Sequence, residues 1–271
     1  MIRNASWTVL VLLLPFSHSA RAEGASLYRI NSAIDVSLIS LGVLGAALPD
    51  LVSSRLITRH CAPCDPGSVN SLDRHVIGND RGWAATTSDI TVGLAATVPI
   101  LIDGVDAGSY AEWRDDMTVY AEVLALNGAL VNLAKYTVQR PRPWTYAPHD
   151  AGRESSPDAF VSFYSGHTSA TFAALSAASM NYTYRHGAHP WPWVITGVVG
   201  AMVGFERVAA GRHFYTDVAT GALVGTGIGI LVPWLHHEQR QQATSTSSLS
   251  ASRLTASPAK GALAMLWSFP F

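Results

Sequence analysis

The stretch FYSGHTSATFAALSAASMNYTYR, residues 163–185, decides the fold class of this chain. After its first turn it is a long run of alanine and other small or apolar residues, which is typical of a buried helix. Ser165 is a good N-cap for that helix, and Gly166 lets an anion approach the backbone closely. His167 follows in the first turn, where free N–H groups bind phosphate well. An ordinary capped helix with a polar first turn is the alternative.

The rest of the chain carries further apolar segments of helical length and little of the alternation typical of strands. We therefore expect an all-α fold, a bundle of about six core helices, by this periodicity. The stretch 139–163 contains four prolines and cannot form one continuous helix. The expected helices lie near residues 30–48, 86–104, 109–136, 165–184, 191–209 and 214–235.

The composition narrows the class of protein. Of the 271 residues, 48% are hydrophobic and only 14% are charged, and the net charge is −1. So apolar a chain is not disordered, and it lacks the basic excess of a nucleic-acid binder. Two classes remain: an apolar soluble helical protein, or a membrane protein with short helices.

The N-terminal sequence MIRNASWTVLVLLLPFSHSARAEG predicts a secretory signal peptide over residues 1–22. Arg3 supplies a positive start, an apolar run follows, and Ala20-Arg21-Ala22 is a small-x-small cleavage signal. The apolar run is short for an uncleaved membrane anchor, which is the alternative. We therefore expect a mature chain that begins outside the cytoplasm.

The two cysteines, Cys61 and Cys64, lie in the stretch HCAPCDPG. In an oxidising compartment this spacing favours a small disulfide loop. A metal site would need more ligands, and a thioredoxin-type redox site would need a helix that Pro66-Gly67 disfavours. Both remain as alternatives.

Two more clusters carry groups that bind anions or move protons. Lys135 and Arg142 lie at the end of an apolar helix and in the proline-rich turn after it, and both suit phosphate oxygens. Arg207, His213 and Asp217 form the other cluster, in which the histidine and the aspartate are four residues apart and share a helix face. A carboxylate that holds one imidazole nitrogen leaves the other free for attack. Solvated cations at helix ends and a surface His–Asp pair are the alternatives.

Together the three clusters supply three cations, a helix start and two histidines, but no acidic pair. This set predicts metal-free phosphoryl transfer through a phosphohistidine. The patterns K-x6-R-P, S-G-H and R-x5-H-x3-D, in this order, resemble the type-2 phosphatidic acid phosphatase superfamily over roughly residues 86–236, a helical core by its periodicity. The resemblance implies His213 as the nucleophile, Asp217 as the group that orients it, and His167 as the general acid. It implies that phosphoryl oxygens are held by Lys135, Arg142, Ser165, Gly166 and Arg207.

Two positions depart from the pattern of that superfamily. Tyr164 stands where proline usually precedes Ser-Gly-His, and Glu206 stands where serine often precedes the arginine. Neither change removes a catalytic group. Arg140 and Arg212 are extra cations, which we expect at the rim of the site.

The superfamily includes lipid phosphatases, soluble periplasmic class A acid phosphatases and vanadium haloperoxidases. The chain is short for the haloperoxidases, so we expect no cofactor and no catalytic metal, with vanadate as an inhibitor. The expected substrate is a phosphorylated lipid. The alternatives are a small phosphoester cleaved by a soluble periplasmic acid phosphatase, a vanadium-dependent haloperoxidase, and a non-catalytic phosphate-headgroup binder. The sequence predicts no oligomeric state.

The segment Ile30–Leu48 decides the expected topology of a membrane-embedded form. After a cleaved signal peptide, crossings by 30–48, 86–104 and 117–134 would place the site in the cytoplasm and the cysteines on the reducing side. If Ile30–Leu48 does not cross, the site and the cysteines all face outward. We therefore expect a packed or peripheral helix here and a site that faces the periplasm, which a soluble periplasmic bundle would satisfy equally well.

The expected organisation has four parts. These are the signal peptide (1–22), an N-terminal helix with the cysteine loop (23–85), the phosphatase core (86–237), and a low-complexity linker with an apolar tip (238–271). The polar composition after Glu238 predicts disorder for the linker.

Overall fold

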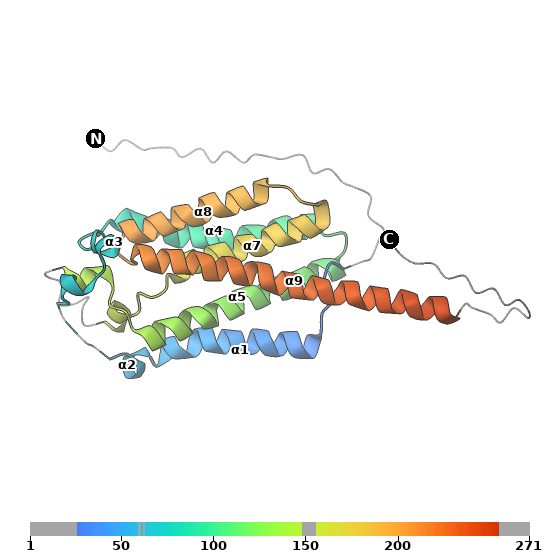
Figure 1. The fold of residues 1–271 in the computed structure, drawn as a ribbon, viewed down its shortest axis with the longest axis horizontal. Coiled ribbons are helices and arrows are strands. Elements are labelled where there is room, and N and C mark those ends of the chain that lie inside the picture. The colour runs from blue at the N-terminus through green and yellow to red at the C-terminus, as the bar shows by residue number, and fades with distance from the viewer. Residues whose placement is uncertain (1–25, 59–60, 62, 148–155, 255–271) are drawn as a thin grey trace, which may run out of the picture.

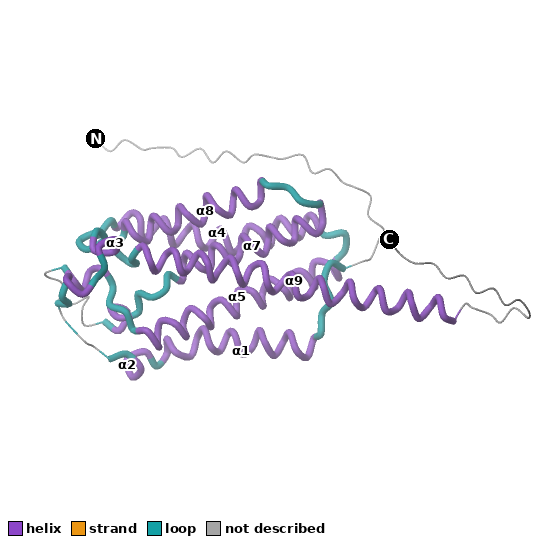
Figure 2. Tube along the Cα trace, viewed as in Figure 1, coloured by secondary structure: helices purple, strands orange, loops and turns teal. Residues whose placement is uncertain are grey.

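The computed structural model describes residues 26–58, 61, 63–147 and 156–254, and all regular elements in these residues are helices (Figures 1 and 2). The all-α expectation is confirmed. The long helices are α1 (Ser32–Leu51), α4 (Gly82–Asp106), α5 (Tyr110–Val138), α7 (Gly166–His186), α8 (Trp191–Ala209) and α9 (Tyr215–Leu254). The short ones are α2 (Ser53–Leu56), η1 (Pro66–Ser68), α3 (Ser71–Arg74), η2 (Pro143–Tyr146) and η3 (Pro157–Phe160).

Local sequence explains where the long helices begin and end. Ser109 caps α5 by accepting a hydrogen bond from the Glu112 N–H, and Ser165 caps α7 in the same way through Thr168. Helix α5 ends at Gln139, whose φ of 48° is left-handed. Between α5 and α7, the described residues form two short 3₁₀ turns, each of which begins at a proline.

Helix α7 lies at the centre of the bundle and packs against α4, α5, α8 and α9, whereas α1 lies outside and packs mainly on α5 (Figure 1). Two close approaches depend on glycine. A Cβ at Gly42 of α1 would lie 2.8 Å from the Ala125 backbone of α5, and one at Gly221 of α9 would lie 2.7 Å from the Ser165 carbonyl oxygen. Small residues therefore set the helix spacing, as is common between membrane helices.

The loops that follow α1, α5 and α8 gather where α7 begins, and we call this the site end of the bundle. They enclose a small apolar core formed by Cys64, Val69, Val76, Tyr146, Ala159, Phe160, Val208 and Phe214. The expected disulfide is confirmed: Cys61 and Cys64 are bonded, with their Cα atoms 4.9 Å apart. Because the Cys64 N–H donates to the Thr145 carbonyl oxygen at 2.8 Å, the cysteine loop is fixed to the loop after α5.

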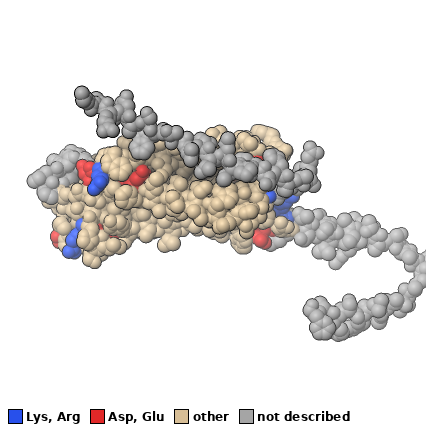
Figure 3. Space-filling model, turned by 90° about the horizontal axis from the view of Figure 1, so that it is seen from above, with Lys and Arg blue, Asp and Glu red and all other residues tan. Residues whose placement is uncertain are grey.

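The lateral surface of the bundle is that of a membrane protein. Four segments are long and apolar enough to cross a membrane by length and composition: Ser32–Leu51, Gly82–Asp106, Tyr110–Tyr146 and Tyr215–Glu238. Many leucine, isoleucine and valine side chains on these segments are exposed. Charged side chains gather toward the two ends of the face in Figure 3, with uncharged surface between them. A band of this kind matches the hydrocarbon layer of a bilayer.

The structure does not support the expectation that Ile30–Leu48 stays out of the membrane. Helix α1 is one of the four candidate spans and lies along the length of α5. The Tyr136 hydroxyl, near the C-terminus of α5, donates to the carboxylate of Asp50, near the C-terminus of α1, at 2.7 Å. Both helices therefore end at the site end. If α1, α4 and α5 all cross, Ser32 and the site end lie on opposite sides of the membrane.

The expected disordered linker is wrong over most of its length, because α9 continues to Leu254 (Figure 1). No glycine or proline lies between Pro233 and Pro258 to end the helix, although serine and threonine are frequent in this stretch. The expected signal peptide and the apolar C-terminal tip lie outside the described residues.

Candidate active site

All eight site residues named from the sequence meet at the site end, and six segments bring them there. Lys135 lies in the last turn of α5 and Arg142 just before η2. Ser165, Gly166 and His167 form the start of α7. Arg207 lies in the last turn of α8, His213 between α8 and α9, and Asp217 in the first turn of α9.

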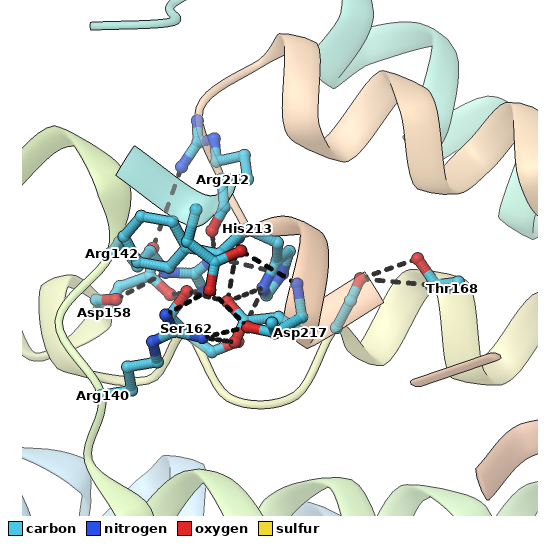
Figure 4. A network of polar contacts seen from close by, with 12 residues as sticks. Arg140, Arg142, Asp158, Ser162, Thr168, Arg212, His213 and Asp217 are labelled. Carbon is cyan, nitrogen blue, oxygen red and sulfur yellow. Dashed lines mark hydrogen bonds and ion pairs between the residues drawn. The ribbon is translucent and has the colours of Figure 1, made fainter. Parts of the chain in front are cut away.

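The His213 imidazole is buried and its two nitrogens have different partners (Figure 4). Its Nδ1 lies 2.7 Å from the Ser162 carbonyl oxygen, which can only accept, so Nδ1 carries the proton. Its Nε2 lies 3.3 Å from Nη1 of Arg142. Burial, with the charges of Arg142, Arg207 and Lys135, holds the pKa of His213 well below its usual value. The ring is therefore neutral, with a lone pair on Nε2 that can act as a nucleophile.

Asp217 does not orient His213 directly, contrary to the prediction from the resemblance. Its Oδ2 lies 3.8 Å from Nδ1 of His213, beyond hydrogen-bond distance. The same oxygen accepts from the Ser162 hydroxyl at 2.6 Å and from the Phe214 N–H at 3.0 Å. Asp217 therefore positions the two backbone segments on either side of the imidazole, and the Ser162 carbonyl orients the ring.

Arg140 is not a rim charge, although the sequence suggested one. Its guanidinium contacts the Asp217 carboxylate at 2.5 Å (Figure 4). It also contacts the Asp73 carboxylate of α3 at 2.8 Å. Both carboxylates are fully buried. Arg212 does lie at the rim: its side chain is 35% exposed and is 3.8 Å from the Asp158 carboxylate.

Arg142 is buried and is fixed in place by groups that the sequence did not indicate. Its Nη2 donates to the Asp158 carboxylate at 2.6 Å, and its Nε donates to the Asp158 carbonyl oxygen at 2.7 Å. Its Nη1 donates to the Arg212 carbonyl oxygen and faces His213 (Figure 4). The Asp158 carboxylate, whose pKa the arginine lowers, sets the position of this cation beside the nucleophile.

Lys135 and Arg207 supply the charge that remains available for an anion. In the part of the chain that the structure describes, the Lys135 ammonium has no hydrogen bond or ion pair, and it lies 3.8 Å from where a Cβ on Gly166 would stand. Arg207 donates from Nη1 to the Ser88 hydroxyl at 3.0 Å, but its buried Nε has no described partner. An unsatisfied buried donor is costly, and a phosphoryl oxygen would satisfy it.

The start of α7 confirms Ser165 as a helix cap. Its side chain is buried and bonded to Thr168, so Ser165 contributes backbone position rather than a free hydroxyl (Figure 4). A side chain on Gly166 would stand 3.1 Å from Val131 and crowd the Lys135 ammonium. Glycine therefore keeps this helix end open to an anion. The aromatic ring of Tyr164, which replaces the usual proline, is buried against Phe163.

The His167 side chain, in the first turn of α7, is 32% exposed. Its Nε2 is 2.8 Å from the Asp89 carboxylate of α4, which also lies 3.3 Å from Arg207. Burial and Arg207 lower the pKa of His167 to about 4, while Asp89 opposes them. Asp89 is thus a partner of the expected general acid that the sequence did not identify.

The site contains no open set of carboxylates for a metal. Asp217, Asp158 and Asp89 are each engaged with an arginine. Among the described residues, the one group of histidines and carboxylates with ligand spacing is Asp35, Glu122 and His236, in the other half of the bundle. The arrangement at the site end can bind an oxyanion between cations and attack it with an imidazole nitrogen.

Comparison with known proteins agrees with this geometry. A family model described as the PAP2 superfamily matches residues 116–241, which contain all eight site residues. The chain is 31% identical over 128 residues to a lipid A 1-phosphatase of Porphyromonas gingivalis, covering 47% of this chain and 25% of that protein. It is also 31% identical over 133 residues to a probable diacylglycerol pyrophosphate phosphatase 1 of Schizosaccharomyces pombe, covering 39% of this chain and 47% of that protein. The chain thus spans less than half the length of each of these curated relatives.

A solved structure is also similar. It is the first transmembrane PAP2 type phosphatidylglycerolphosphate phosphatase from Bacillus subtilis, with a TM-score of 0.44 and 20% sequence identity. The match covers 77% of this chain and 96% of that one.

Proposed function

We propose that this protein is a phosphatase that cleaves a phosphomonoester or pyrophosphate of a lipid through a phosphohistidine on His213. The match of residues 116–241 to the PAP2 superfamily model supports the proposal. One observation carries the proposal. The lone pair on Nε2 of His213 faces a site bordered by Arg142, Arg207 and Lys135, all at the site end. An imidazole held neutral among cations is suited to attack an anion that those cations bind.

The reaction would take place in two steps. In the first, Nε2 of His213 attacks phosphorus, the bond from phosphorus to the leaving oxygen breaks, and His167 gives its proton to that oxygen. The proton on Nδ1 stays there and is donated in a hydrogen bond to the Ser162 carbonyl oxygen, which stabilises the positive charge that forms on the ring. In the second step, water attacks phosphorus, His167 takes up its proton, and the bond from phosphorus to Nε2 breaks. The products are inorganic phosphate and either the alcohol, from a phosphomonoester, or the lipid phosphate, from a pyrophosphate.

Charge neutralisation in this proposal comes from side chains and backbone N–H groups of the protein. Lys135 and Arg207 have donors free for phosphoryl oxygens, and the first N–H groups of α7 add to them. We therefore propose catalysis without a metal or cofactor. Vanadate, which mimics the five-coordinate transition state, would inhibit.

A lipid substrate is favoured over a water-soluble phosphoester. The site opens at the end of a bundle whose lateral surface is apolar, so a headgroup at the bilayer surface would be at the right depth. Both curated relatives are named as phosphatases of lipids. Phosphatidic acid, phosphatidylglycerol phosphate, an isoprenyl pyrophosphate and a lipid A phosphate are the candidates.

We propose that the site faces the outside of the cytoplasmic membrane. The disulfide lies at the site end, and such bonds persist in oxidising compartments. With α1, α4 and α5 as spans, this orientation puts Ser32 on the cytoplasmic side. A cleaved signal peptide would instead leave the new N-terminus outside, so it is compatible with an outward site only if α1 does not cross.

A substrate panel on the purified full chain tests the function. Lipid phosphates in mixed micelles are compared with p-nitrophenyl phosphate, with and without excess EDTA. We expect hydrolysis of a lipid phosphate in EDTA, and labelled phosphate trapped on the protein by rapid quench. His213→Ala would abolish both, whereas His189→Ala, an exposed histidine between α7 and α8, would change neither. Full activity of His213→Ala would refute the mechanism, and halide oxidation with vanadate and peroxide would indicate a haloperoxidase.

A further inference from the structure

Three titratable side chains that the proposed reaction does not use meet in the bundle interior. Asp35 lies in the first turn of α1, Glu122 in the middle of α5, and His236 well along α9. They are 3%, 4% and 7% exposed, respectively. About 20 Å of α5 separates Glu122 from Lys135, at 1.5 Å per residue. The cluster is therefore separate from the phosphatase site.

The imidazole of His236 is fixed in the tautomer that a metal ligand needs. Its Nδ1 lies 3.0 Å from the Val232 carbonyl oxygen, and because a carbonyl can only accept, Nδ1 donates. The neutral ring then has its lone pair on Nε2. That atom faces the two carboxylates, 3.6 Å from Oδ1 of Asp35 and 3.5 Å from Oε2 of Glu122. A histidine whose second nitrogen donates to a backbone carbonyl is the common form of a metal-binding histidine.

The carboxylates also present unsatisfied acceptors to this point. Oε2 of Glu122 is buried and has no hydrogen-bond partner among the described residues. Asp35 accepts the Asn31 N–H on Oδ2 at 2.8 Å, which leaves Oδ1 for the cluster. Three acceptor atoms thus converge in the bundle interior. Burying them without a donor costs free energy, and a cation between them would remove that cost.

The spacing of these atoms fits a small cation. All three ligand atoms lie within 4.8 Å of one another. Two ligands held about 2.1 Å from a tetrahedral zinc ion are about 3.4 Å apart. The two distances from His236, 3.5 and 3.6 Å, are close to that value. Oxygen and imidazole ligands suit zinc or manganese, and two carboxylates balance the charge of a divalent ion.

We propose that Asp35, Glu122 and His236 bind one divalent cation of the zinc or manganese class, which joins α1 to α5 and α9. Helix α1 otherwise packs mainly on α5, and the Arg29 N–H donates to the His236 carbonyl oxygen at 3.2 Å beside the cluster. The cation would thus fix the start of the outermost helix to the bundle. Its role is structural and does not depend on the proposed phosphatase reaction.

Metal content and thermal stability test the site. The full chain is purified in detergent with a tag that contains no histidine, stripped with a strong chelator, and dialysed against Zn²⁺ or Mn²⁺. We expect about one metal per chain by elemental analysis, in line with a single three-ligand site, and a melting temperature several degrees higher with metal than without it. Glu122→Gln and His236→Gln would lose the metal and the shift.

Matched variants separate this site from general effects of mutation. Asp115→Asn on α5 and His237→Gln on α9 lie outside the three ligands and would keep both metal and shift. Phosphatase activity of metal-free Glu122→Gln at low temperature would report that the site end is still folded. If Glu122→Gln does not fold, Asp35→Asn, which keeps an acceptor for the Asn31 N–H, takes its place. Wild-type protein that binds no metal would overturn the proposal.

Discussion

At the scale of single residues, a backbone carbonyl determines which nitrogen of His213 carries the proton. The nearby carboxylates act only indirectly, by holding the residue that supplies this carbonyl. The Ser162 carbonyl oxygen accepts a hydrogen bond from Nδ1, the Asp217 carboxylate accepts one from the Ser162 hydroxyl, and Arg140 donates one to Asp217. An imidazole oriented in this way keeps its proton on the side away from the anion.

His167 gives the site a pH dependence whose sign can be worked out. With a pKa of about 4, about one free molecule in a thousand carries the acidic proton at pH 7, so a bound phosphate dianion must raise that pKa for catalysis. The rate then falls as pH rises through the pKa of the complex. Asp89→Asn removes a charge that raises this pKa, so the alkaline limb of the kcat profile should move to lower pH. Asp115→Asn is the control and should leave the alkaline limb unchanged. An unchanged limb in Asp89→Asn would contradict the assignment of His167 as the acid.

The sequence identified the residues that we propose contact the anion, but not the residues that hold them in place. Lys135, Arg142 and His213 stand out because cations and histidines in apolar surroundings are uncommon. Asp73, Asp89 and Asp158 carry no such local signal, since an aspartate in a polar stretch looks like any solvated residue. Asp89 and His167 are 78 residues apart, and only the packing of α4 on α7 brings them together.

At the scale of elements, the contact between α7 and α9 links the two catalytic motifs. A Cβ on Gly221 would lie 2.7 Å from the Ser165 carbonyl oxygen, and one on Gly225 would lie 2.2 Å from that of Ser169. The helices meet backbone to backbone along this line, with no side chain between them. The position of His167 relative to Asp217 is therefore set by helix packing.

Substitution at Gly221 tests this contact. Gly221→Ala should force α9 away from Ser165, destabilise the protein by about 1–3 kcal/mol and lower kcat as the two motifs separate. Gly227→Ala on the same helix meets nothing within 4 Å and should be neutral or gain up to about 1 kcal/mol. Thermal unfolding and steady-state kinetics on both variants provide the measurement. If both variants had the same stability and the same kcat, the close approach of α9 to Ser165 would not be needed for folding or for activity.

The sequence predicted the six long helices well because each is a continuous apolar run bounded by caps, glycines or prolines. The start of every one lies within four residues of the expected position. The end of α9 was wrong because polar composition was taken as disorder, although the absence of helix breakers allowed α9 to continue. Helix α1 packs on α5, as one of the two expected alternatives had it, through close contacts at glycines that periodicity does not reveal.

At the scale of the whole molecule, the orientation in the membrane can be tested with two engineered cysteines. Leu72 lies in α3 at the site end and is 56% exposed, and Tyr110 lies at the opposite end and is 75% exposed. In intact cells, a membrane-impermeant maleimide should label Leu72→Cys and not Tyr110→Cys. The native cysteines are bonded to each other and would not react. The reverse pattern would place the site in the cytoplasm.

The backbone contact between α7 and α9 has a consequence for the energetics of turnover. A general acid and a nucleophile held on mobile loops would have to lose conformational freedom each time a substrate binds. Here that loss of freedom occurs once, when the chain folds and the two helices come together. Binding energy from the substrate is then available to stabilise the transition state rather than to assemble the site.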